Sequence, residues 1–211
     1  MQIITTKQYK LDKSVGHGVL TAGIQLAPAR EAAAVLQRPD LPTVCPFSGA
    51  CVAGCLKYTG MNQLPTHALA RAKRTAMYWD EPEAFFAQVI HELHAVERKA
   101  ERLGLAFAIR PNALQDLPPL ADRIARAFPG AHVYDYTKIP SPWTRTRKRP
   151  NYTLAYSVSE RSTGRQIRAC VDHGINCAVV FDTRKGEPLP ATYTLAGRTL
   201  PVVDGDVSDL V

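Results

Sequence analysis

The amino-acid sequence predicts an α/β fold, built as an incomplete (β/α) barrel or as an open, mostly parallel sheet with flanking helices. Short apolar runs bounded by Gly or Pro alternate along the chain with amphipathic segments of helical periodicity, as in βαβ units. The 211 residues hold five or six such runs, whereas a complete eight-stranded barrel takes about 250 residues. We therefore expect a single α/β domain over residues 1–211.

The first half of the chain contains one candidate strand and two candidate helices. Residues 18–24 form a short apolar run that we interpret as the first strand. A helix is predicted over residues 66–79, with Thr66 as its N-cap. A second helix is predicted over residues 80–104, because it has a proline in its first turn, apolar residues at helical spacing and a glycine at its end.

The second half continues the alternation. The expected strands are residues 105–109, 131–136, 152–158 and 177–181, with a short last one at 201–203. The expected helices are residues 117–128 and 165–173. In either architecture the working residues gather at the carboxyl ends of the parallel strands, so candidate functional residues are sought there.

Composition excludes several classes of protein. The 26 Lys and Arg outnumber the 19 Asp and Glu, and the net charge of +7 suits a polyanionic partner. No apolar run reaches the roughly 18 residues of a membrane span, and the first residues lack the apolar segment of a secretory signal. The five cysteines are an odd number, which argues against a disulfide framework. We expect a cytoplasmic protein with no membrane partner, and the oligomeric state stays open.

Three of the cysteines lie close together after the first candidate strand. Cys45, Cys51 and Cys55 have the spacing C-x5-C-x3-C in a segment rich in Gly and Pro, residues 45–55, which we call the cysteine loop. Three thiolates at this spacing can converge on one metal centre, and three ligands leave an open coordination position. We predict an iron–sulfur cluster here. The alternative is a zinc ion completed by a nearby histidine, His17 or His67.

Polar residues follow several of the candidate strands. We predict three of them to act in proton transfer or substrate anchoring: Asp116, Asp135 and Lys138. Others at the same strand ends are predicted to bind substrate: Arg110, Asn112, Tyr136, Ser157, Ser159, Glu160, Asp204 and Asp206. For any one of them, capping of the following helix is the alternative interpretation.

A second feature is the basic arm, residues 138–149, which carries five cations and no acid. Its prolines favour an extended chain, and its aromatic residue supplies a face for base stacking. The residues of the arm predicted to bind phosphate or bases are Trp143, Arg145, Arg147, Lys148 and Arg149. Arg71 and Arg74, one helical turn apart, are predicted to add phosphate contacts, unless they belong to an ordinary exposed helix surface.

Several motifs together resemble a known family. The segments 18–28 and 45–56 and the pattern Ala70-Arg71-x2-Arg74-Thr75 are similar to the opening of the phage gene-product-eighty-eight family. The segments 134–138, 157–160 and 203–206 extend the similarity over nearly the whole chain. The resemblance implies a protein of phages or mobile elements, in the host cytoplasm where phage-encoded, and it implies no activity.

A looser, fold-level resemblance is to radical S-adenosylmethionine enzymes. In those enzymes three cluster cysteines lie after the first strand of a partial barrel, and this resemblance implies S-adenosylmethionine as a further cofactor. This chain departs from their usual C-x3-C-x2-C spacing, has Gly54 where they have an aromatic residue, and lacks their Gly-Gly-Glu motif.

These observations lead to one functional hypothesis and two alternatives. The hypothesis is a metal-dependent enzyme, with an iron–sulfur cluster, that acts on a nucleic acid or nucleotide. The first alternative is a zinc-stapled nucleic-acid-binding protein without catalysis. The second is a base transglycosylase that uses one aspartate as nucleophile and another as base.

Overall fold

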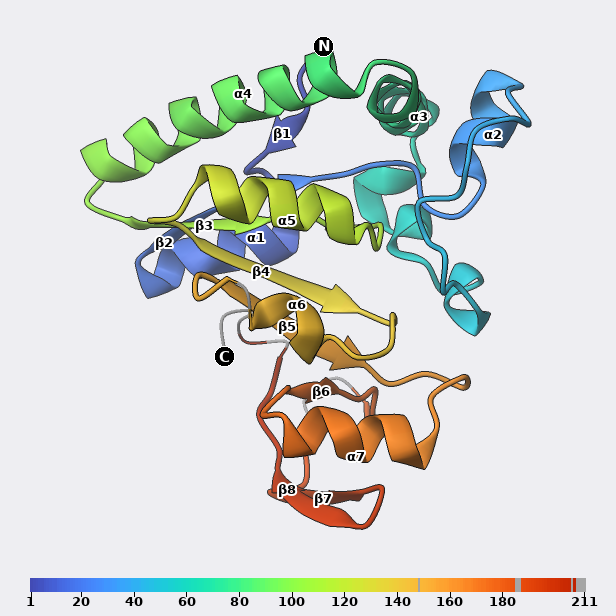
Figure 1. Ribbon diagram of the computed structural model, residues 1–211, viewed down its shortest axis with the longest axis vertical. Helices are drawn as coiled ribbons and strands as arrows, with labels where there is room; N and C mark the ends of the chain where they lie inside the picture. The colour runs from blue at the N-terminus through green and yellow to red at the C-terminus, as the bar shows by residue number, and fades with distance from the viewer. Residues whose placement is uncertain (148, 185–186, 206, 208–211) are drawn as a thin grey trace.

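The computed structural model describes residues 1–147, 149–184, 187–205 and 207. Its main sheet has six strands: β1 (Ile4–Thr5), β2 (Val19–Ile24), β3 (Ala106–Arg110), β4 (His132–Thr137), β5 (Tyr152–Ser157) and β6 (Cys177–Ala178). The strands lie in chain order, and β2 to β6 pair in parallel while β1 pairs antiparallel with β2 (Figure 1). The sheet of the described residues is open, with β1 and β6 at its edges. The predicted open α/β fold is thus confirmed.

Helices connect the parallel strands. The α-helices are α1 (Tyr9–Asp12), α2 (Glu31–Leu36), α3 (Pro65–Asp80), α4 (Pro82–Arg102), α5 (Pro118–Ala127), α6 (Trp143–Thr146) and α7 (Gly164–Asp172). Four 3₁₀ turns accompany them: η1 (Lys13–His17), η2 (Ala50–Val52), η3 (Leu56–Tyr58) and η4 (Gly60–Gln63). Proline in the first turn starts α3, α4 and α5, and α7 starts with a capping box between Thr163 and Gln166.

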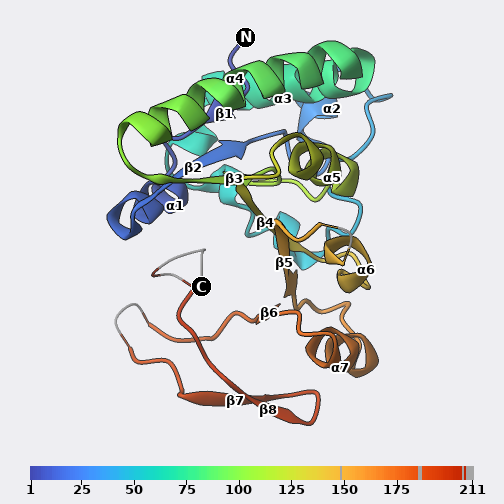
Figure 2. The ribbon, with the colours of Figure 1, turned by 60° about the vertical axis from the view of Figure 1, so that its left-hand side comes forward.

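The two faces of the sheet are covered differently. Ile109, Val133 and Leu154 belong to the same buried cluster as the apolar faces of α4 and α5. On the opposite face of β2, the Oγ atoms of Ser14 and Thr21 lie 2.7 Å apart, and η1 thereby packs there. Figure 2 shows α5, α6 and α7 on one side of the strands and α1 on the other. Successive side chains of a strand point to opposite faces of the sheet, so each strand contributes residues to both of these layers.

Two of the expected strands differ in the structure. The strand expected over residues 177–181 is only two residues long. The strand expected at 201–203 is wrong, because that segment ends a separate antiparallel hairpin of β7 (Thr192–Leu195) and β8 (Arg198–Pro201). Ala196 and Gly197 both have positive φ, 50° and 82°, which is the backbone of a tight two-residue hairpin turn. Figure 2 shows this hairpin at the end of the molecule opposite α4.

The parallel order brings the carboxyl ends of β2, β3, β4 and β5 to one rim of the sheet. The segments that leave this rim carry the cysteine loop, residues 111–117, residues 138–142 and residues 158–163. None of the helices among the described residues has the length and apolar composition that a membrane crossing requires.

Candidate functional site

The cysteine loop is anchored to the rim at its start. Val44, immediately before the first cysteine, is fully buried in the main core. Its carbonyl oxygen accepts a 2.9 Å hydrogen bond from the backbone N–H of Asp116, in the segment after β3. The Cys45 thiol contacts the carbonyl oxygen of Leu114 at 3.6 Å. Residues that are about seventy positions apart in the sequence are thus held side by side.

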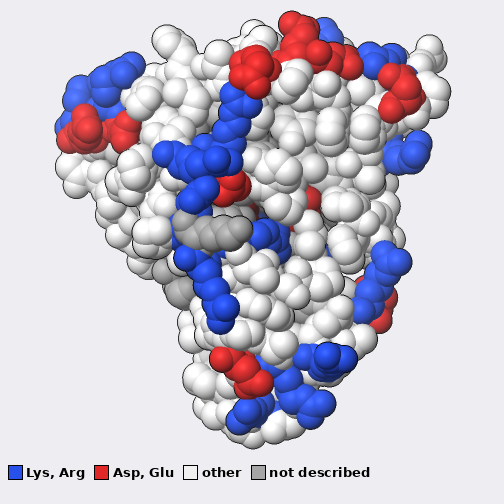
Figure 3. Space-filling model, viewed as in Figure 1, with Lys and Arg blue, Asp and Glu red and all other residues white. Residues whose placement is uncertain are grey.

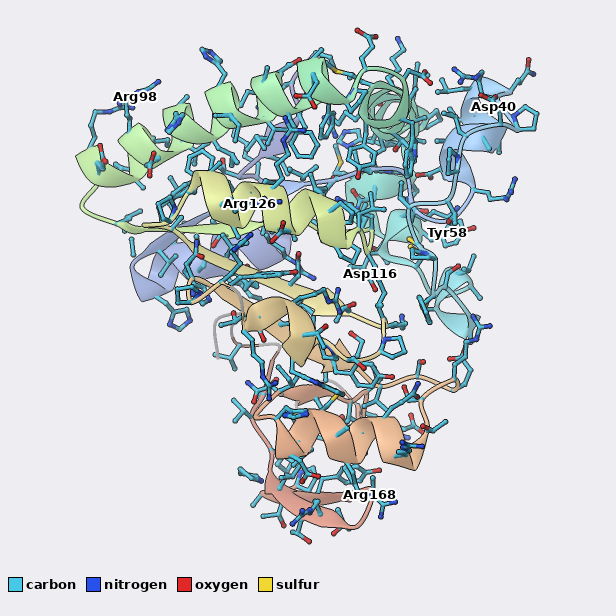
Figure 4. All side chains as sticks on the ribbon, in the orientation of Figure 1. Asp40, Tyr58, Arg98, Asp116, Arg126 and Arg168 are labelled. Atoms are coloured by element: carbon cyan, nitrogen blue, oxygen red, sulfur yellow. The ribbon has the colours of Figure 1, made fainter. Side chains whose placement is uncertain are left out.

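All three loop cysteines line one cavity of about 250 Å³, which we call the main cavity. Six further residues predicted for the site also line it: Arg110, Asn112, Asp116, Tyr136, Lys138 and Ser157. Figure 4 shows Asp116 beside the N-terminal end of α5 and the carboxyl end of β4. The structure therefore brings together the cysteines and the ends of three successive strands, as the strand-end rule predicts.

The thiols in this cavity differ in their acidity. Burial of the Cys51 thiol opposes ionisation, but a hydrogen bond from the Gly49 backbone and the nearby Lys138 ammonium outweigh it and lower the pKa. Burial raises the pKa of Cys45 to about 11, and the neighbouring acidic groups Cys55, Asp116 and Cys51 act in the same direction. Of Cys45 and Cys51, Cys51 is thus the one better prepared to act as a thiolate.

The three thiols of the cysteine loop are of the right chemical type for a metal centre, but they do not lie close enough together to form one. Cysteine thiolates are the usual ligands of iron–sulfur clusters and of structural zinc. Within the described part of the chain, however, no three Cys, His, Asp or Glu side chains already form a metal site. Neither His17 nor His67 lines the main cavity. Cys45, Cys51 and Cys55 would hold such a centre as thiolates, after loss of their protons and with their sulfur atoms brought closer together.

Asp116 is the carboxylate that lies beside the cysteines. Its oxygens accept hydrogen bonds from Thr137 Oγ1 at 2.9 and 3.0 Å and from the backbone N–H of Lys138 at 2.9 Å. Burial nevertheless raises its pKa above the usual range. Asp116 thus lies at the cavity with a carboxyl group suited to proton transfer.

Asp135 lies apart from the cavity, which corrects its predicted catalytic role. Its side chain is 3% exposed and accepts two 2.8 Å hydrogen bonds from Asn112, one from the backbone N–H and one from Nδ2. Tyr152 donates a third at 3.4 Å. Burial raises its pKa to about 7. Since strand side chains alternate, Asp135 points to the helix-covered face while Tyr136 lines the cavity. Asp135 therefore holds the segment after β3 in place through Asn112 and does not contact a substrate in the main cavity.

Cationic side chains border the same cavity. Lys138 lies at the carboxyl end of β4, and its ammonium group interacts with the Cys51 thiol. Arg110 is largely buried, and its guanidinium carbon lies 5.0 Å from the centroid of the Tyr136 ring. These two cations and Asp116 give the cavity wall charges of both signs.

The basic arm is partly folded, which corrects the expectation of an extended chain. It contains the short helix α6, and its Trp143 ring packs on His173 with centroids 4.4 Å apart. The indole is thereby joined to the cluster around α7 and is not a free face for base stacking. Lys148 lies outside the described residues.

The arginines of the arm contact neighbouring groups. Arg145 Nη2 donates to Thr137 Oγ1 at 3.2 Å, and so lies close to Asp116. Arg147 contacts His173 at 3.1 Å, and Arg149 pairs with Asp122 of α5 at 3.1 Å. Figure 3 shows a band of Lys and Arg side chains across the face that carries α5 and α6, with acidic side chains among them. The arm thus lies on a surface to which neighbouring elements add acidic side chains, such as Asp122 of α5.

The two arginines of α3 do not form a phosphate site. Arg71 is 1% exposed, and its Nε and Nη2 atoms donate to the Glu31 carboxylate at 3.0 and 2.9 Å. Arg74 donates to the backbone oxygens of Gln2 and Gln25, at 2.8 and 3.4 Å. Both side chains hold segments of the fold together, and the predicted phosphate role of Arg71 is wrong because its guanidinium is buried and paired.

The remaining predicted residues divide between the rim and the end of the chain. Ser159 and Glu160 follow β5, and the Glu160 carboxylate accepts a 2.9 Å hydrogen bond from the backbone N–H of Ala50 in the cysteine loop. Asp204 is exposed and does not line the main cavity. Asp206 lies outside the described residues.

Gln115 is a residue of this site that the sequence interpretation missed. Its buried amide accepts from the backbone N–H of Leu26 at 3.1 Å and donates to the carbonyl oxygens of Pro111 at 2.8 Å and Ile24 at 3.3 Å. Gln115 thereby ties the end of β2 to the segment after β3. Its place one residue before Asp116, after a predicted strand, was the available signal.

Comparison with known proteins identifies the family. The family described as Gene product 88 matches residues 5–211. The chain belongs to the Gene product 88 family. No curated protein and no solved structure matches the chain. The fold-level likeness to radical S-adenosylmethionine enzymes therefore stays a prediction for this Gene product 88 protein.

Proposed function

We propose that this Gene product 88 protein is a metal-dependent enzyme that acts on a nucleic acid or nucleotide. Cys45, Cys51 and Cys55 would hold the metal, as an iron–sulfur cluster or, in the alternative, as zinc. The observation that carries the proposal is that the main cavity is lined at once by the three thiols, by Asp116 and by Lys138.

The neighbours of the proposed centre have distinct roles. Asp116, with a raised pKa and a position on the cavity wall, would hold or accept a proton of the substrate. Lys138 and Arg110 supply positive charge where an anionic substrate would enter. The metal, when bound, would supply an open coordination position or an electron, depending on which metal it is.

The geometry supports this proposal better than the two alternatives. A transglycosylase needs two carboxylates that face one base pocket, and Asp135 faces away from the cavity that Asp116 lines. A binder without catalysis has no need for a carboxylate beside its metal staple, because Asp116 would repel phosphate. The zinc-stapled binder is nevertheless the alternative that a measurement has to distinguish from the proposed enzyme.

The test is turnover by the anaerobically reconstituted protein. Nucleotides and short oligonucleotides are incubated with reduced protein, with and without S-adenosylmethionine, and the products are read by mass spectrometry. We expect a mass change in one substrate, at least a hundredfold loss of rate with Asp116→Asn, and full rate with Cys177→Ser, a thiol that lines neither the main cavity nor the cavity that adjoins it. A protein that carries metal yet leaves every substrate unchanged would instead support the zinc-stapled binder.

A further inference from the structure

A second cavity of about 240 Å³ adjoins the main cavity. Phe47 and Lys138 line both, so that the two cavities share a wall. The other lining residues come from the cysteine loop, the segment after β4, β5, the segment after β5 and α7: Pro46, Pro140, Tyr156, Ser159, Arg161 and Gln166. The second cavity is thus a continuation of the rim toward α7.

The charges of the second cavity are positive. Lys138 and Arg161 reach it from two different segments of the chain, and none of the described residues that line it is acidic. The neighbouring Glu160 points its carboxylate at the Ala50 backbone N–H, at 2.9 Å. Arg161 Nη1 donates to the Ser48 carbonyl oxygen at 3.3 Å, which holds the guanidinium at the cavity. Two cations and the Ser159 hydroxyl suit an anion with several oxygens, such as phosphate.

The sizes of the two cavities favour one ligand that spans both. At about 250 and 240 Å³, each lies below the roughly 300–1,000 Å³ of a typical small-molecule site, whereas together they reach that range. Phe47 lines both cavities and is 38% exposed, so its ring offers a flat face at the junction. A ligand that carries both a flat group and a phosphate matches the two cavities, with the flat group against Phe47 and the phosphate on the cations.

We propose that the second cavity is the phosphate subsite of the site described above, and that the substrate is a nucleotide or the 5′-phosphorylated end of an oligonucleotide. The phosphate would lie on Lys138 and Arg161, and the base would lie against Phe47 and extend into the main cavity. This inference rests on the proposed function, because it takes the main cavity as the place of the reaction.

The test is calorimetric binding to the full-length protein. The probes are the four ribonucleoside 5′-monophosphates, the four nucleosides, and tetranucleotides with and without a 5′-phosphate. We expect at least one phosphorylated probe to bind at least tenfold more tightly than its unphosphorylated partner. Arg161→Ala should remove this preference, while Arg168→Ala, which removes an exposed cation of α7 that does not line the cavity, should change affinity less than twofold. A phosphate preference among the mononucleotides indicates a nucleotide substrate, and a preference among the tetranucleotides alone indicates the 5′-phosphorylated end of an oligonucleotide.

Three results would overturn the phosphate subsite. They are equal affinity of phosphorylated and unphosphorylated probes, equal losses in Arg161→Ala and Arg168→Ala, and no binding of any probe at millimolar concentration. Circular dichroism of Arg161→Ala shows whether the variant is folded. Metal content is measured on the same samples, so that a protein without metal but with an Arg161-dependent phosphate preference contradicts the proposed function alone.

Discussion

The Glu160 carboxylate and the Ala50 backbone are joined by a 2.9 Å hydrogen bond that ties the segment after β5 to the cysteine loop. The nearby Gly49 makes this approach possible, because a Cβ atom there would lie 2.0 Å from Glu160 Oε1. The ends of β2 and β5, three strands apart in the sheet, are thus coupled across the rim. The position of the loop depends on this contact.

Gly49→Ala should therefore free the cysteine loop. The new methyl group displaces the Glu160 carboxylate, and a lost hydrogen bond of about 0.5–1.5 kcal/mol predicts roughly two- to tenfold faster amide hydrogen exchange over residues 45–55. Gly54→Ala is the matched control, because nothing lies within 4 Å of a Cβ atom there. Equal acceleration in both variants would show that the contact with Glu160 is unimportant.

Gln115→Leu should destabilise the protein strongly. The substitution leaves the buried backbone N–H of Leu26 and the carbonyl oxygen of Pro111 without their partner, whereas the Ile24 carbonyl oxygen keeps a 3.2 Å hydrogen bond from the Ala113 N–H. At about 1–3 kcal/mol for each unsatisfied group, we expect a loss on the order of 2–4 kcal/mol in the free energy of unfolding, measured with urea. Gln63→Leu, at an exposed position, should cost less than about 0.5 kcal/mol. Similar losses in the two variants would contradict the bridging role.

Asp135 should make stability depend on pH. Its pKa is raised to about 7 in the folded protein, from an ordinary value of 3.8, so the folded state binds the proton more tightly. The stabilisation is complete below about pH 4 and is lost as the pH rises through 7, at roughly 1.4 kcal/mol for each unit of difference in pKa. Asp135→Asn does not titrate. The stability of the wild type relative to this variant should thus fall between pH 4 and 8.

The control for this effect is Asp182→Asn, at an exposed position. Urea unfolding of the three proteins at several pH values measures the difference directly. A constant difference between the wild type and Asp135→Asn from pH 4 to 8 would show that Asp135 is ionised throughout.

Glu31→Ala should be among the most destabilising single substitutions. It leaves the 1% exposed Arg71 as a buried cation without its carboxylate, which typically costs about 3–5 kcal/mol. Replacing both residues by Met should cost less than Glu31→Ala alone. The exposed pair of Arg38 and Asp80 provides the control, and Asp80→Ala should cost less than about 1 kcal/mol. Thermal unfolding of the four proteins tests the ranking, and comparable losses from Glu31→Ala and Asp80→Ala would refute it.

The sequence was sufficient to predict the parallel sheet and the rim. Apolar runs alternating with helices specify the order of strands, and the order specifies which ends meet, so that Cys51, Asp116 and Lys138 were expected together. What it lacked was the direction of single side chains. Asp135 and Tyr136 are adjacent in the same strand, and only the position of the helix layer decides that Asp135 is buried on the far face.

Long-range pairing was the other missing information. An arginine on a helix is predicted to be exposed unless its partner is known, and Glu31 lies forty residues before Arg71. The hairpin was missed for a related reason, since β7 and β8 are too short and too polar to be distinguished from a loop.

The most direct test of the central claim is the metal content per chain of anaerobically purified and reconstituted protein, with its optical spectrum. The wild type and Cys177→Ser should carry one centre per chain, with the visible absorption of an iron–sulfur cluster, and Cys45→Ser, Cys51→Ser and Cys55→Ser should each lose it. A colourless protein with one zinc per chain would select the alternative metal. A wild type without stoichiometric metal, or single variants that all retain it, would contradict the claim that these three cysteines hold one metal centre.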